Sequence, residues 1–421
     1  MTHFTTGRAG AAELDAQDAL APLRDRFVND DPGLIYLDGN SLGRLPHAAA
    51  DRIAAVVREE WGRDLIRSWS HWIDYGQRLG DAIGRHLVGA APGQVAISDS
   101  TTVNLYKLAA AAIGARPGRD VIVTDDDNFP TDRYVLEGLA ERHGMRLRML
   151  HADLDDGLDA ETLRAAVGPD TALVSLSHVA YRSGRLYDMA AINRIVHDSG
   201  ALVLWDLCHS VGAVPVELDS SATDLAVGCT YKYVNGGPGA PALLYVRRDL
   251  QESLRQPIQG WFSQTDQFAM GPDYAPAPGI ARFLTGTPPI VSMVAIEEGV
   301  KLLAEAGIDA LRAKGALLTA YLIELADERL APLGFTVATP RDPAVRGSHV
   351  SLRHPDAWRI SQALIEHAKV IPDYRTPDRL RLGPAPITTA FTDVWDAVDR
   401  LCDVVASGAY EAFSAEPARV T

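Results

Sequence analysis

The 421-residue sequence has few cysteines, no long apolar run and no cluster of basic residues. Its three cysteines, Cys208, Cys229 and Cys402, match neither a CxxC motif nor another metal-binding spacing. We therefore expect reduced thiols, no disulfide framework and no metal site. A membrane-spanning helix needs roughly 18 consecutive apolar residues, and no stretch provides them. We expect a cytoplasmic protein without membrane association.

Charge and composition narrow the class of protein further. The chain carries 55 acidic and 40 basic residues, a formal net charge of -15. Because a nucleic-acid backbone would repel such a surface unless basic residues were clustered, we expect no nucleic-acid partner. With 47% hydrophobic and 23% charged residues, the chain is long enough for a large and a small domain around substantial cores.

Between about residue 95 and residue 246, short apolar runs alternate with helical patterns. This alternation predicts an α/β fold with a mostly parallel, seven-stranded sheet flanked by helices. The seven apolar runs begin near residues 95, 121, 147, 172, 201, 225 and 242, and the helices are predicted over 101–113, 132–143, 160–167 and 189–198. In such a sheet, ligands bind at the carboxyl ends of the strands.

The pattern also predicts how the chain divides. We expect an N-terminal segment over 1–50, a large domain over 51–290, and a linking helix with a small C-terminal α/β domain over 291–421. A helix should open at Pro46 and end near Trp61, and one long helix should span 290–326. The segment 255–289 is rich in Pro, Gly and aromatics, which indicates a packed functional or interface loop.

Asp206 and Lys232 are the most informative residues in the chain, since each is predicted at the end of an apolar strand. Such a pair can surround the flat ring of pyridoxal phosphate (PLP). The aldehyde of PLP bonds covalently to a lysine amine, and a carboxylate keeps its ring nitrogen protonated. A lysine at a strand end is more often a solvated charge, but Tyr231, Tyr233 and the glycines after Asn235 favour the catalytic interpretation. The sequence therefore predicts an enzyme.

Other segments supply the groups that this cofactor requires. Asp99 to Asn104 follow a strand and open a helix, so their backbone N–H groups and hydroxyls suit a phosphate, although an ordinary capping box fits equally. Phe129, in Phe-Pro-Thr-Asp, could stack on the ring or could belong to the core. His209 is expected to support the site rather than to perform chemistry.

Taken together, these motifs resemble the kynureninase family, whose members have the PLP-dependent fold type I. The resemblance covers nearly the whole chain. It is carried by the segments 36–43 (YLDGNSLG), 64–69 (DLIRSW), 129–132 (FPTD), 205–212 (WDLCHSVG), 231–233 (YKY) and 379–383 (RLRLG).

The resemblance implies a role for each matching residue. Lys232 would bond the cofactor, Asp206 would pair with its ring nitrogen beside His209, and Phe129 would stack on the ring near Asp132. The cofactor shell would also include Thr101, Thr102, Pro130, Thr131, Ser177, Tyr231, Trp261 and Thr287. Trp261 and Thr287 would come from the neighbouring subunit, so the active site would require a homodimer. Arg381 would bind the substrate carboxylate through two parallel bonds, and Trp69 and Gly286 would shape the pocket for an aromatic ketone.

The activity that this resemblance implies is hydrolysis of L-kynurenine, and possibly of 3-hydroxy-L-kynurenine, to the corresponding anthranilate and L-alanine. Lys232, Tyr231 and Asp206 would be the catalytic residues, with Tyr231 as a proton donor. The reaction would serve tryptophan catabolism or NAD biosynthesis. An aminotransferase or a cysteine desulfurase of the same fold is the alternative within the class. The desulfurase needs a nucleophilic cysteine on a mobile loop, whereas Cys402 lies in an apolar helical pattern.

Two alternatives of other classes are weaker. A non-catalytic scaffold with this fold would be indicated by loss of Lys232, Asp206 or Arg381, and all three are present. A nucleotide-binding α/β enzyme would carry a glycine-rich phosphate loop, and the sequence has neither GxGxxG after the first strand nor GxxxxGK[ST].

Overall fold

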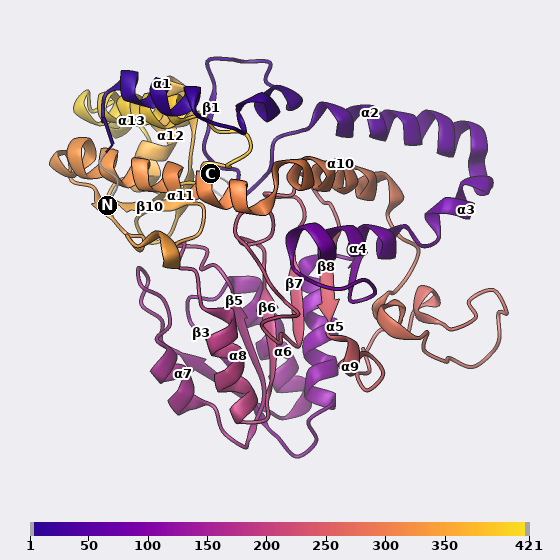
Figure 1. Cartoon of the computed structure of the whole chain (residues 1–421). Helices are drawn as coiled ribbons and strands as arrows, with labels where there is room; N and C mark the ends of the chain where they lie inside the picture. The colour runs from indigo at the N-terminus through magenta and orange to yellow at the C-terminus, as the bar shows by residue number, and fades with distance from the viewer. Residues whose placement is uncertain (1–3, 417–421) are drawn as a thin grey trace.

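The computed structural model describes residues 4–416 and contains one large sheet with helices on both faces (Figure 1). The seven strands lie in the order β2-β8-β7-β6-β5-β3-β4. Strand β8 is antiparallel to both neighbours, and the other pairs are parallel. The strands are β2 (Val95–Ser98), β3 (Val121–Asp125), β4 (Arg146–Leu150), β5 (Thr171–Ser177), β6 (Leu202–Asp206), β7 (Leu225–Gly228) and β8 (Ala242–Val246). The predicted mostly parallel, seven-stranded sheet is confirmed.

Alternation along these strands explains why both faces of the sheet are covered. In β6, Val203 and Trp205 belong to one hydrophobic cluster, whereas Leu202 and Leu204 belong to another. Helices α5 (Thr101–Gly114) and α6 (Pro130–His143) pack in the second cluster. The first cluster receives α4 (Tyr75–Leu87), α7 (Ala160–Ala166), α8 (Met189–Asp198) and α10 (Ile290–Ala306). Because buried strands present apolar residues to both faces of the sheet, their sequences are continuous apolar runs.

A second hydrophobic core lies in the C-terminal part of the chain. It is built on a four-stranded antiparallel sheet in the order β12-β13-β10-β9, covered by α11, α12 and α13. The elements are β9 (Thr336–Val337), β10 (Val350–Arg353), β12 (Asp373–Arg375), β13 (Arg379–Leu382), α11 (Ile308–Leu325), α12 (Ala357–Ala368) and α13 (Phe391–Ala406). Strands β9, β10 and β13 match the predicted small α/β module.

The N-terminal segment packs with this second core. Helix α1 (Arg8–Ala16) contacts α13, and β1 (Ile35–Tyr36) pairs with β11 (Val370–Ile371) in parallel. Figure 1 shows the indigo α1 beside the yellow C-terminal helices. We propose that the chain divides as the sequence predicts, into 1–50, 51–290 and 291–421, with the first and last parts joined through this second core.

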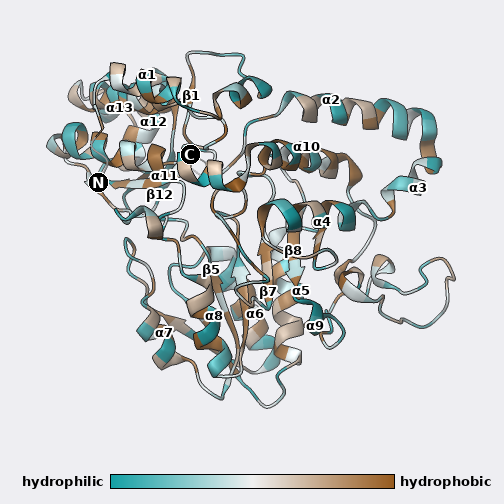
Figure 2. Cartoon of the chain, in the orientation of Figure 1, coloured by the Kyte–Doolittle hydropathy of each residue, from teal (hydrophilic) through white to brown (hydrophobic). Residues whose placement is uncertain are grey.

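One predicted helix changes its winding along its length, and another is interrupted. The helix that follows Pro46 is α2 (His47–Ala55), and it continues as a π-helical turn over Val56–Asp64 before the short α3 (Trp69–Trp72). The long helix predicted over 290–326 is two helices, α10 and α11, because Gly307 between them has φ +77°. Glycine adopts this backbone conformation at little cost, and it turns the chain from the first core to the second. Figure 2 shows α10 largely brown, in keeping with its burial between α2 and α4.

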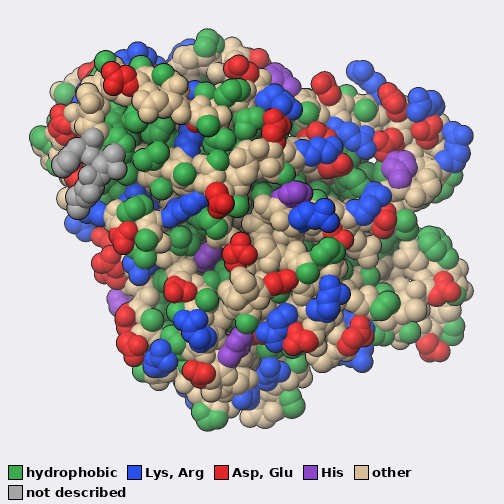
Figure 3. Space-filling view, viewed as in Figure 1, with side chains coloured by type: hydrophobic (Ala, Val, Ile, Leu, Met, Phe, Trp, Pro, Cys, Tyr) green, Lys and Arg blue, Asp and Glu red, His purple; other side chains and the backbone are tan. Residues whose placement is uncertain are grey.

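Both charge signs occur on the face of the molecule that Figure 3 draws. On the face drawn in Figure 3, acidic and basic side chains are interspersed rather than gathered into one basic patch. Within residues 4–416, no helix combines the length and the apolar composition that crossing a bilayer requires.

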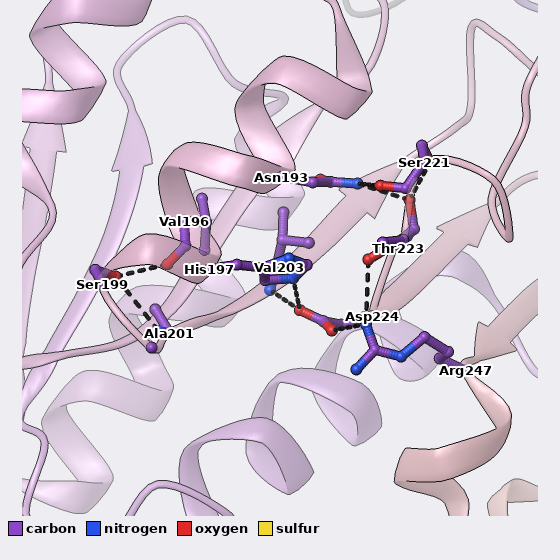
Figure 4. A network of polar contacts seen from close by, with 12 residues as sticks. Asn193, Val196, His197, Ser199, Ala201, Val203, Ser221, Thr223, Asp224 and Arg247 are labelled. Carbon is purple, nitrogen blue, oxygen red and sulfur yellow. Dashed lines mark hydrogen bonds and ion pairs between the residues drawn. The ribbon is translucent and has the colours of Figure 1, made fainter.

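A buried polar network connects the starts of β6 and β7, at the end of the sheet opposite Asp206 (Figure 4). Asp224, 1% exposed, accepts hydrogen bonds from the Val203 backbone N–H and from His197 Nε2, both at 2.9 Å, and pairs with Arg247 at 2.8 Å. It therefore ties the starts of β6 and β7 to α8.

Asp224→Ala should lower the free energy of unfolding by about 3 kcal/mol, because Arg247 and the Val203 N–H would lose their buried acceptor. Urea unfolding followed by circular dichroism measures this loss. Asp249→Ala is the matched control, since Asp249 pairs with the same arginine at 2.7 Å but its side chain is 66% exposed. Equal effects of the two substitutions would contradict a structural role for the buried network.

Candidate active site

Asp206 is the last residue of β6, as predicted, and it is buried. Its Oδ1 accepts a hydrogen bond from the Cys208 backbone N–H at 2.8 Å. Burial raises the pKa of Asp206, while hydrogen bonds from Cys208 and the positive charge of Lys232 oppose that shift. A carboxylate in this position requires a cation beside it.

Lys232 lies beyond its strand rather than at the strand end that the sequence predicts. Strand β7 ends at Gly228, and Lys232 sits in a tight turn in which Asn235 N donates to Lys232 O and Gly236 N donates to Thr230 O, both at 2.9 Å. Asn235 has φ +59°, a conformation that asparagine tolerates better than most residues. The correction has a physical reason, since the turn reverses the chain for antiparallel β8 and directs the amine inward. The side chain is buried, with Nζ 3.3 Å from His209 Nε2.

A second buried carboxylate, Asp132, lies close to this pair. It is 1% exposed in the first turn of α6, and its Oδ2 has no hydrogen-bond partner among the described residues. Burial raises the pKa of Asp132 well above its usual value, the charge of Asp206 adds to the rise, and the charge of Lys232 opposes it. One amine therefore faces two buried acids.

An aromatic side chain borders the same space. Lys232 Nζ lies 5.9 Å from the ring centroid of Phe129 and 5.9 Å from that of Tyr231. Phe129 is 37% exposed at the start of α6, and its ring meets Tyr181 edge-on at 5.3 Å. Pro130 opens α6 with its fixed φ, and Thr131 follows it, so both are positioned by the helix start.

The start of α5 lies at another border of the site and has the features of an anion-binding helix start. Ser100 caps the helix by accepting from Val103 N at 3.3 Å, and Thr101 and Thr102 are the first two helical residues. Thr101 Oγ1 lies 3.9 Å from Cys208 Sγ, which places this helix start next to the turn after Asp206. Unpaired backbone N–H groups and the helix dipole favour a negatively charged group there.

Ser177 and His209 also lie where the sequence places them. Ser177 pairs with Asp206 in the register of β5 and β6, but its hydroxyl donates to Asn128 Oδ1 at 2.8 Å. His209 is buried, and burial lowers its pKa well below the usual value, with the charge of Lys232 contributing next. Its imidazole is therefore neutral near pH 7.

His349 is a site residue that sequence reasoning missed. It precedes β10, is fully buried, and its ring centroid lies 5.6 Å from that of His209. Neither ring nitrogen has a hydrogen-bond partner within the described chain. The sequence carries no signal for it, because a histidine at the start of a short apolar strand resembles any core histidine.

Arg381 is positioned by a set of buried partners that were also not predicted. It lies in β13, is 1% exposed, and forms an ion pair with Asp373 of β12. Its Nη1 donates to Tyr181 O at 2.6 Å, and its Nη2 donates to Ser41 Oγ at 3.0 Å. Ser41 belongs to the motif YLDGNSLG, so the N-terminal segment, the loop after β5 and the small sheet meet at this arginine.

The four other predicted residues lie apart from Lys232 in the same chain. Trp69 contacts Phe262 with ring centroids 6.1 Å apart, and Phe262 contacts Trp261 at 5.3 Å. Phe262 N donates to Thr285 O at 2.9 Å, next to the exposed Gly286 and Thr287. Among the described residues, no hydrogen bond or ring contact joins Trp69, Trp261 or Thr287 to Lys232.

Comparison with known proteins identifies the family. The kynureninase of Pseudomonas fluorescens is 47% identical over 408 residues, which covers 95% of this chain and 96% of that protein. The kynureninase of Burkholderia pseudomallei is 46% identical over 415 residues, covering 96% and 97%. This chain belongs to the kynureninase family. In agreement, the family model for the kynureninase C-terminal domain matches residues 311–401.

The remaining comparisons concern the fold. The model of the DegT/DnrJ/EryC1/StrS aminotransferase family matches residues 72–217. A solved structure of a cystine C–S lyase with glycine covalently linked to PLP has a TM-score of 0.77 at 21% identity, covering 90% of this chain and 99% of that one. A cysteine desulfurase from Thermococcus onnurineus has a TM-score of 0.76 at 18% identity, covering 97% and 99%. The kynureninase-family chain therefore has the predicted PLP-dependent fold type I.

The residues at this site fit PLP. Asp132 and Asp206 are two buried acids beside one lysine, and the unpartnered Oδ2 of Asp132 indicates that a further cationic or donor group is accommodated there. The helix start at Thr101 suits a phosphate, and the half-open Phe129 ring suits a flat heterocycle.

Borohydride reduction of the PLP-loaded protein should fix the cofactor to the peptide that contains Lys232, because this is the only lysine whose amine lies beside both Asp206 and Phe129 in the described chain. Lys232→Arg should lose both this adduct and the visible absorbance. Lys369→Arg, a change at an exposed lysine, should retain both. Visible absorbance and a labelled peptide in Lys232→Arg would contradict the assignment.

Proposed function

We propose that this kynureninase-family enzyme hydrolyses L-kynurenine to anthranilate and L-alanine with PLP as its cofactor. The observation that carries the proposal is the buried group of Lys232, Asp206 and Asp132 in a chain 47% identical to a kynureninase over nearly its whole length. Cleavage of the Cβ–Cγ bond leaves an electron pair on carbon, and PLP, when bound, supplies the electron sink.

Lys232 is the residue that holds the cofactor and moves the proton at Cα of the substrate. Its amine is buried, and its hydrogen-bonding neighbour His209 is neutral, so the amine can lose and regain a proton without a competing cation at 3.3 Å. Support for this role comes from the turn that fixes Lys232 between Thr230 and Asn235.

Asp206 and Asp132 hold the ring end of the cofactor. Asp206 is anchored by the Cys208 N–H at 2.8 Å, and it is the carboxylate we assign to the ring nitrogen. Asp132 has a strongly raised pKa, so it retains a proton more readily and can donate a hydrogen bond where Asp206 accepts one. Two buried carboxylates that differ in protonation avoid the repulsion that two negative charges would create.

Tyr231 is the proton donor for the alanine fragment. Burial raises the pKa of its phenol above the usual value, with Cys229 contributing next, so the phenol keeps its proton near neutral pH. Its ring centroid lies 5.9 Å from Lys232 Nζ, the amine to which we assign the Cα proton. Arg381 binds the substrate carboxylate, and Trp69 and Gly286 shape the pocket for the aromatic ketone.

A homodimer completes the site. Trp261 and Thr287 are assigned to the neighbouring subunit, and this is supported by their exposure and by an apolar hollow of about 820 Å³ beside the turn after Lys232. Trp61, Leu65 and Ile66 near the hollow are 59%, 60% and 76% exposed. An exposed apolar surface of this kind suits a second copy of the chain.

The competing activities have less support. Cys402 lies in α13, where its Sγ is 3.8 Å from Arg329 O, rather than on a mobile loop, so a desulfurase has no nucleophile there. We infer that the enzyme acts in the cytoplasm, in tryptophan catabolism or in the supply of precursors for NAD biosynthesis. The three free thiols support a reducing compartment.

The PLP-loaded enzyme should convert L-kynurenine into equimolar anthranilate and L-alanine, measured by fluorescence and by chromatography. Tyr231→Phe should slow alanine release by about 10²-fold or more while exchange of the Cα proton with solvent, followed by NMR, continues. Tyr233→Phe is the control, because Tyr233 is buried next to Lys232 and, within residues 4–416, its hydroxyl bonds only Ser348 O, at 3.5 Å. Absence of anthranilate in the wild type would refute the proposed function.

Hybrid dimers test the shared site. Lys232→Ala chains and chains carrying both Trp261→Ala and Thr287→Ala should each be inactive alone. Mixed dimers should have one intact site, and so about half of the wild-type activity, because the defects fall together in the other site. Dimers reassembled from the two variants, separated by different affinity tags, should be assayed with L-kynurenine. No recovery in verified hybrids would show that the lysine and the tryptophan act within one chain.

A further inference from the structure

The hydrogen-bond donors of Arg381 are almost fully used by the protein. A guanidinium has five N–H groups. Nη1 of Arg381 donates to Tyr181 O at 2.6 Å, and Nη2 donates to Asp373 and Ser41. With the Asn40 amide turned so that its oxygen faces the guanidinium, the orientation that satisfies both groups, that oxygen also accepts from Nε at 2.8 Å and from Nη2 at 3.0 Å. In the part of the chain described, one N–H on Nη1 is therefore left for a substrate. The predicted two-bond grip on a carboxylate requires two.

Arg381 is also too deeply buried to contact a substrate through more than a small part of its side chain. Its side chain is 1% exposed, and its partner Asp373 is 0% exposed. A buried ion pair of this kind neutralises most of the charge that would attract an incoming carboxylate. Arg381 by itself therefore offers a single donor and little net positive charge.

Arg375 lies on the other side of the same aspartate. Its Nη1 donates to Asp373 Oδ1 at 2.5 Å and to Tyr374 O at 2.8 Å. Arg381 bonds the opposite oxygen, Oδ2, and in the β12–β13 pairing Asp373 stands directly across from Arg381. The two guanidinium groups thus flank one carboxylate and are held at a fixed separation by it.

Arg375 has the free donors that Arg381 lacks. Its side chain is 30% exposed, and within residues 4–416 neither Nε nor Nη2 has a hydrogen-bond partner. It is also connected to the site through Asp373, which bonds both Arg375 and Arg381. Burial chiefly lowers the pKa of His349, and the positive charges of Arg381, Lys232 and Arg375 add to that shift. The charge of Arg375 therefore acts on His349, whose ring lies 5.6 Å from that of His209.

The charges around the two arginines leave an excess of positive charge. Asp373 is one counter-ion, and Asp38, which follows β1, is the other acid of the cluster. Burial raises the pKa of Asp38 to about 7, with Asp373 contributing next, and its Oδ1 has no partner among the described residues. Two arginines therefore share the counter-ion Asp373 and a second carboxyl, Asp38, that keeps its proton more readily than an ordinary aspartate, and this balance favours an anion.

We propose that Arg375 is a second substrate-binding residue, which donates to the α-carboxylate of the substrate together with the one free N–H of Arg381. Asp373 is the positioning residue that holds both guanidinium groups for this task. The inference rests on the proposed function, because it takes an amino acid with a free α-carboxylate as the substrate. It assigns the second bond of the grip to a residue that the sequence did not single out.

A pair of ligands isolates the carboxylate. 4-(2-Aminophenyl)-4-oxobutanoic acid keeps the aromatic ketone and the carboxylate of kynurenine but has no α-amine, so it binds without reacting. 2′-Aminopropiophenone lacks the carboxylate as well. The dissociation constants of both ligands for the PLP-loaded enzyme are to be measured by isothermal titration calorimetry, in the wild type and in three variants.

Arg375→Gln should weaken binding of the acid about tenfold or more and leave binding of the propiophenone within twofold, because a hydrogen bond between charged groups is lost. Arg375→Lys keeps a positive charge beside Asp373 but loses the planar guanidinium. It should therefore weaken binding of the acid less than Arg375→Gln does. Arg353→Gln is the matched control, since Arg353 is an exposed arginine in the same small sheet, and both ligands should bind it as they bind the wild type.

Three other outcomes would each overturn this inference, and the last of them would overturn the proposed function as well. Unchanged binding of the acid in Arg375→Gln, while the wild type still turns over L-kynurenine, would overturn this inference and leave the proposed function standing. Equal weakening of both ligands in Arg375→Gln and in Arg375→Lys would also overturn it, since the effect would not depend on the carboxylate. A wild type that neither binds the acid nor turns over kynurenine would overturn the proposed function and this inference with it.

Discussion

The burial of Asp132 and Asp206 beside a single amine, that of Lys232, is the constraint on which the rest of the site depends. Carboxylates removed from water are strongly destabilised unless a cation or a proton compensates them. Lys232 can compensate one of the two, and the raised pKa of Asp132 indicates how the other is accommodated without its own cation. A site built in this way is stable only when a further positively charged group enters or when one acid keeps a proton. The same imbalance makes it a site for a protonated heterocycle.

The parallel sheet places these two acids and the one amine together, because the carboxyl ends of its strands lie side by side. Asp206 ends β6 and Ser177 ends the neighbouring β5, and the turn after β7 brings Lys232 to the same end of the sheet. At the opposite end of the sheet, Asp224 accepts from Val203 N and pairs with Arg247, which joins the starts of β6 and β7 (Figure 4). Because Trp205 Nε1 donates to Asn193 of α8 at 2.8 Å, the residue next to Asp206 is fixed as well. Polar groups with a structural role at one end of the sheet thus support the site residues Asp206 and Lys232 at the other end.

The sequence predicts the large sheet and the residues on its strand ends well, because apolar runs and helix starts are local signals. Asp206, Phe129, Thr101 and Asp132 lie where these signals place them. Lys232 is displaced from its strand, because a turn residue with positive φ, Asn235, is not visible as a pattern. His349, Asp373 and Arg375 were not found, since they reach the site through antiparallel pairing in the small sheet, and such long-range pairing leaves no local periodicity. The contribution of a second chain that we propose for Trp261 and Thr287 likewise has no local signal in the sequence.

The histidines complete the electrostatics of the site. Three cations, Lys232, Arg375 and Arg381, surround His209 and His349, and burial together with these charges lowers the pKa of both imidazoles. A charged imidazole here would add a further positive charge to a buried space that already contains three. Neutral imidazoles instead offer nitrogens that can accept a hydrogen bond next to the Lys232 amine, 3.3 Å away in the case of His209. The cluster of arginines therefore does more than bind an anion, because it also keeps the neighbouring imidazoles in the form that can take part in proton transfer.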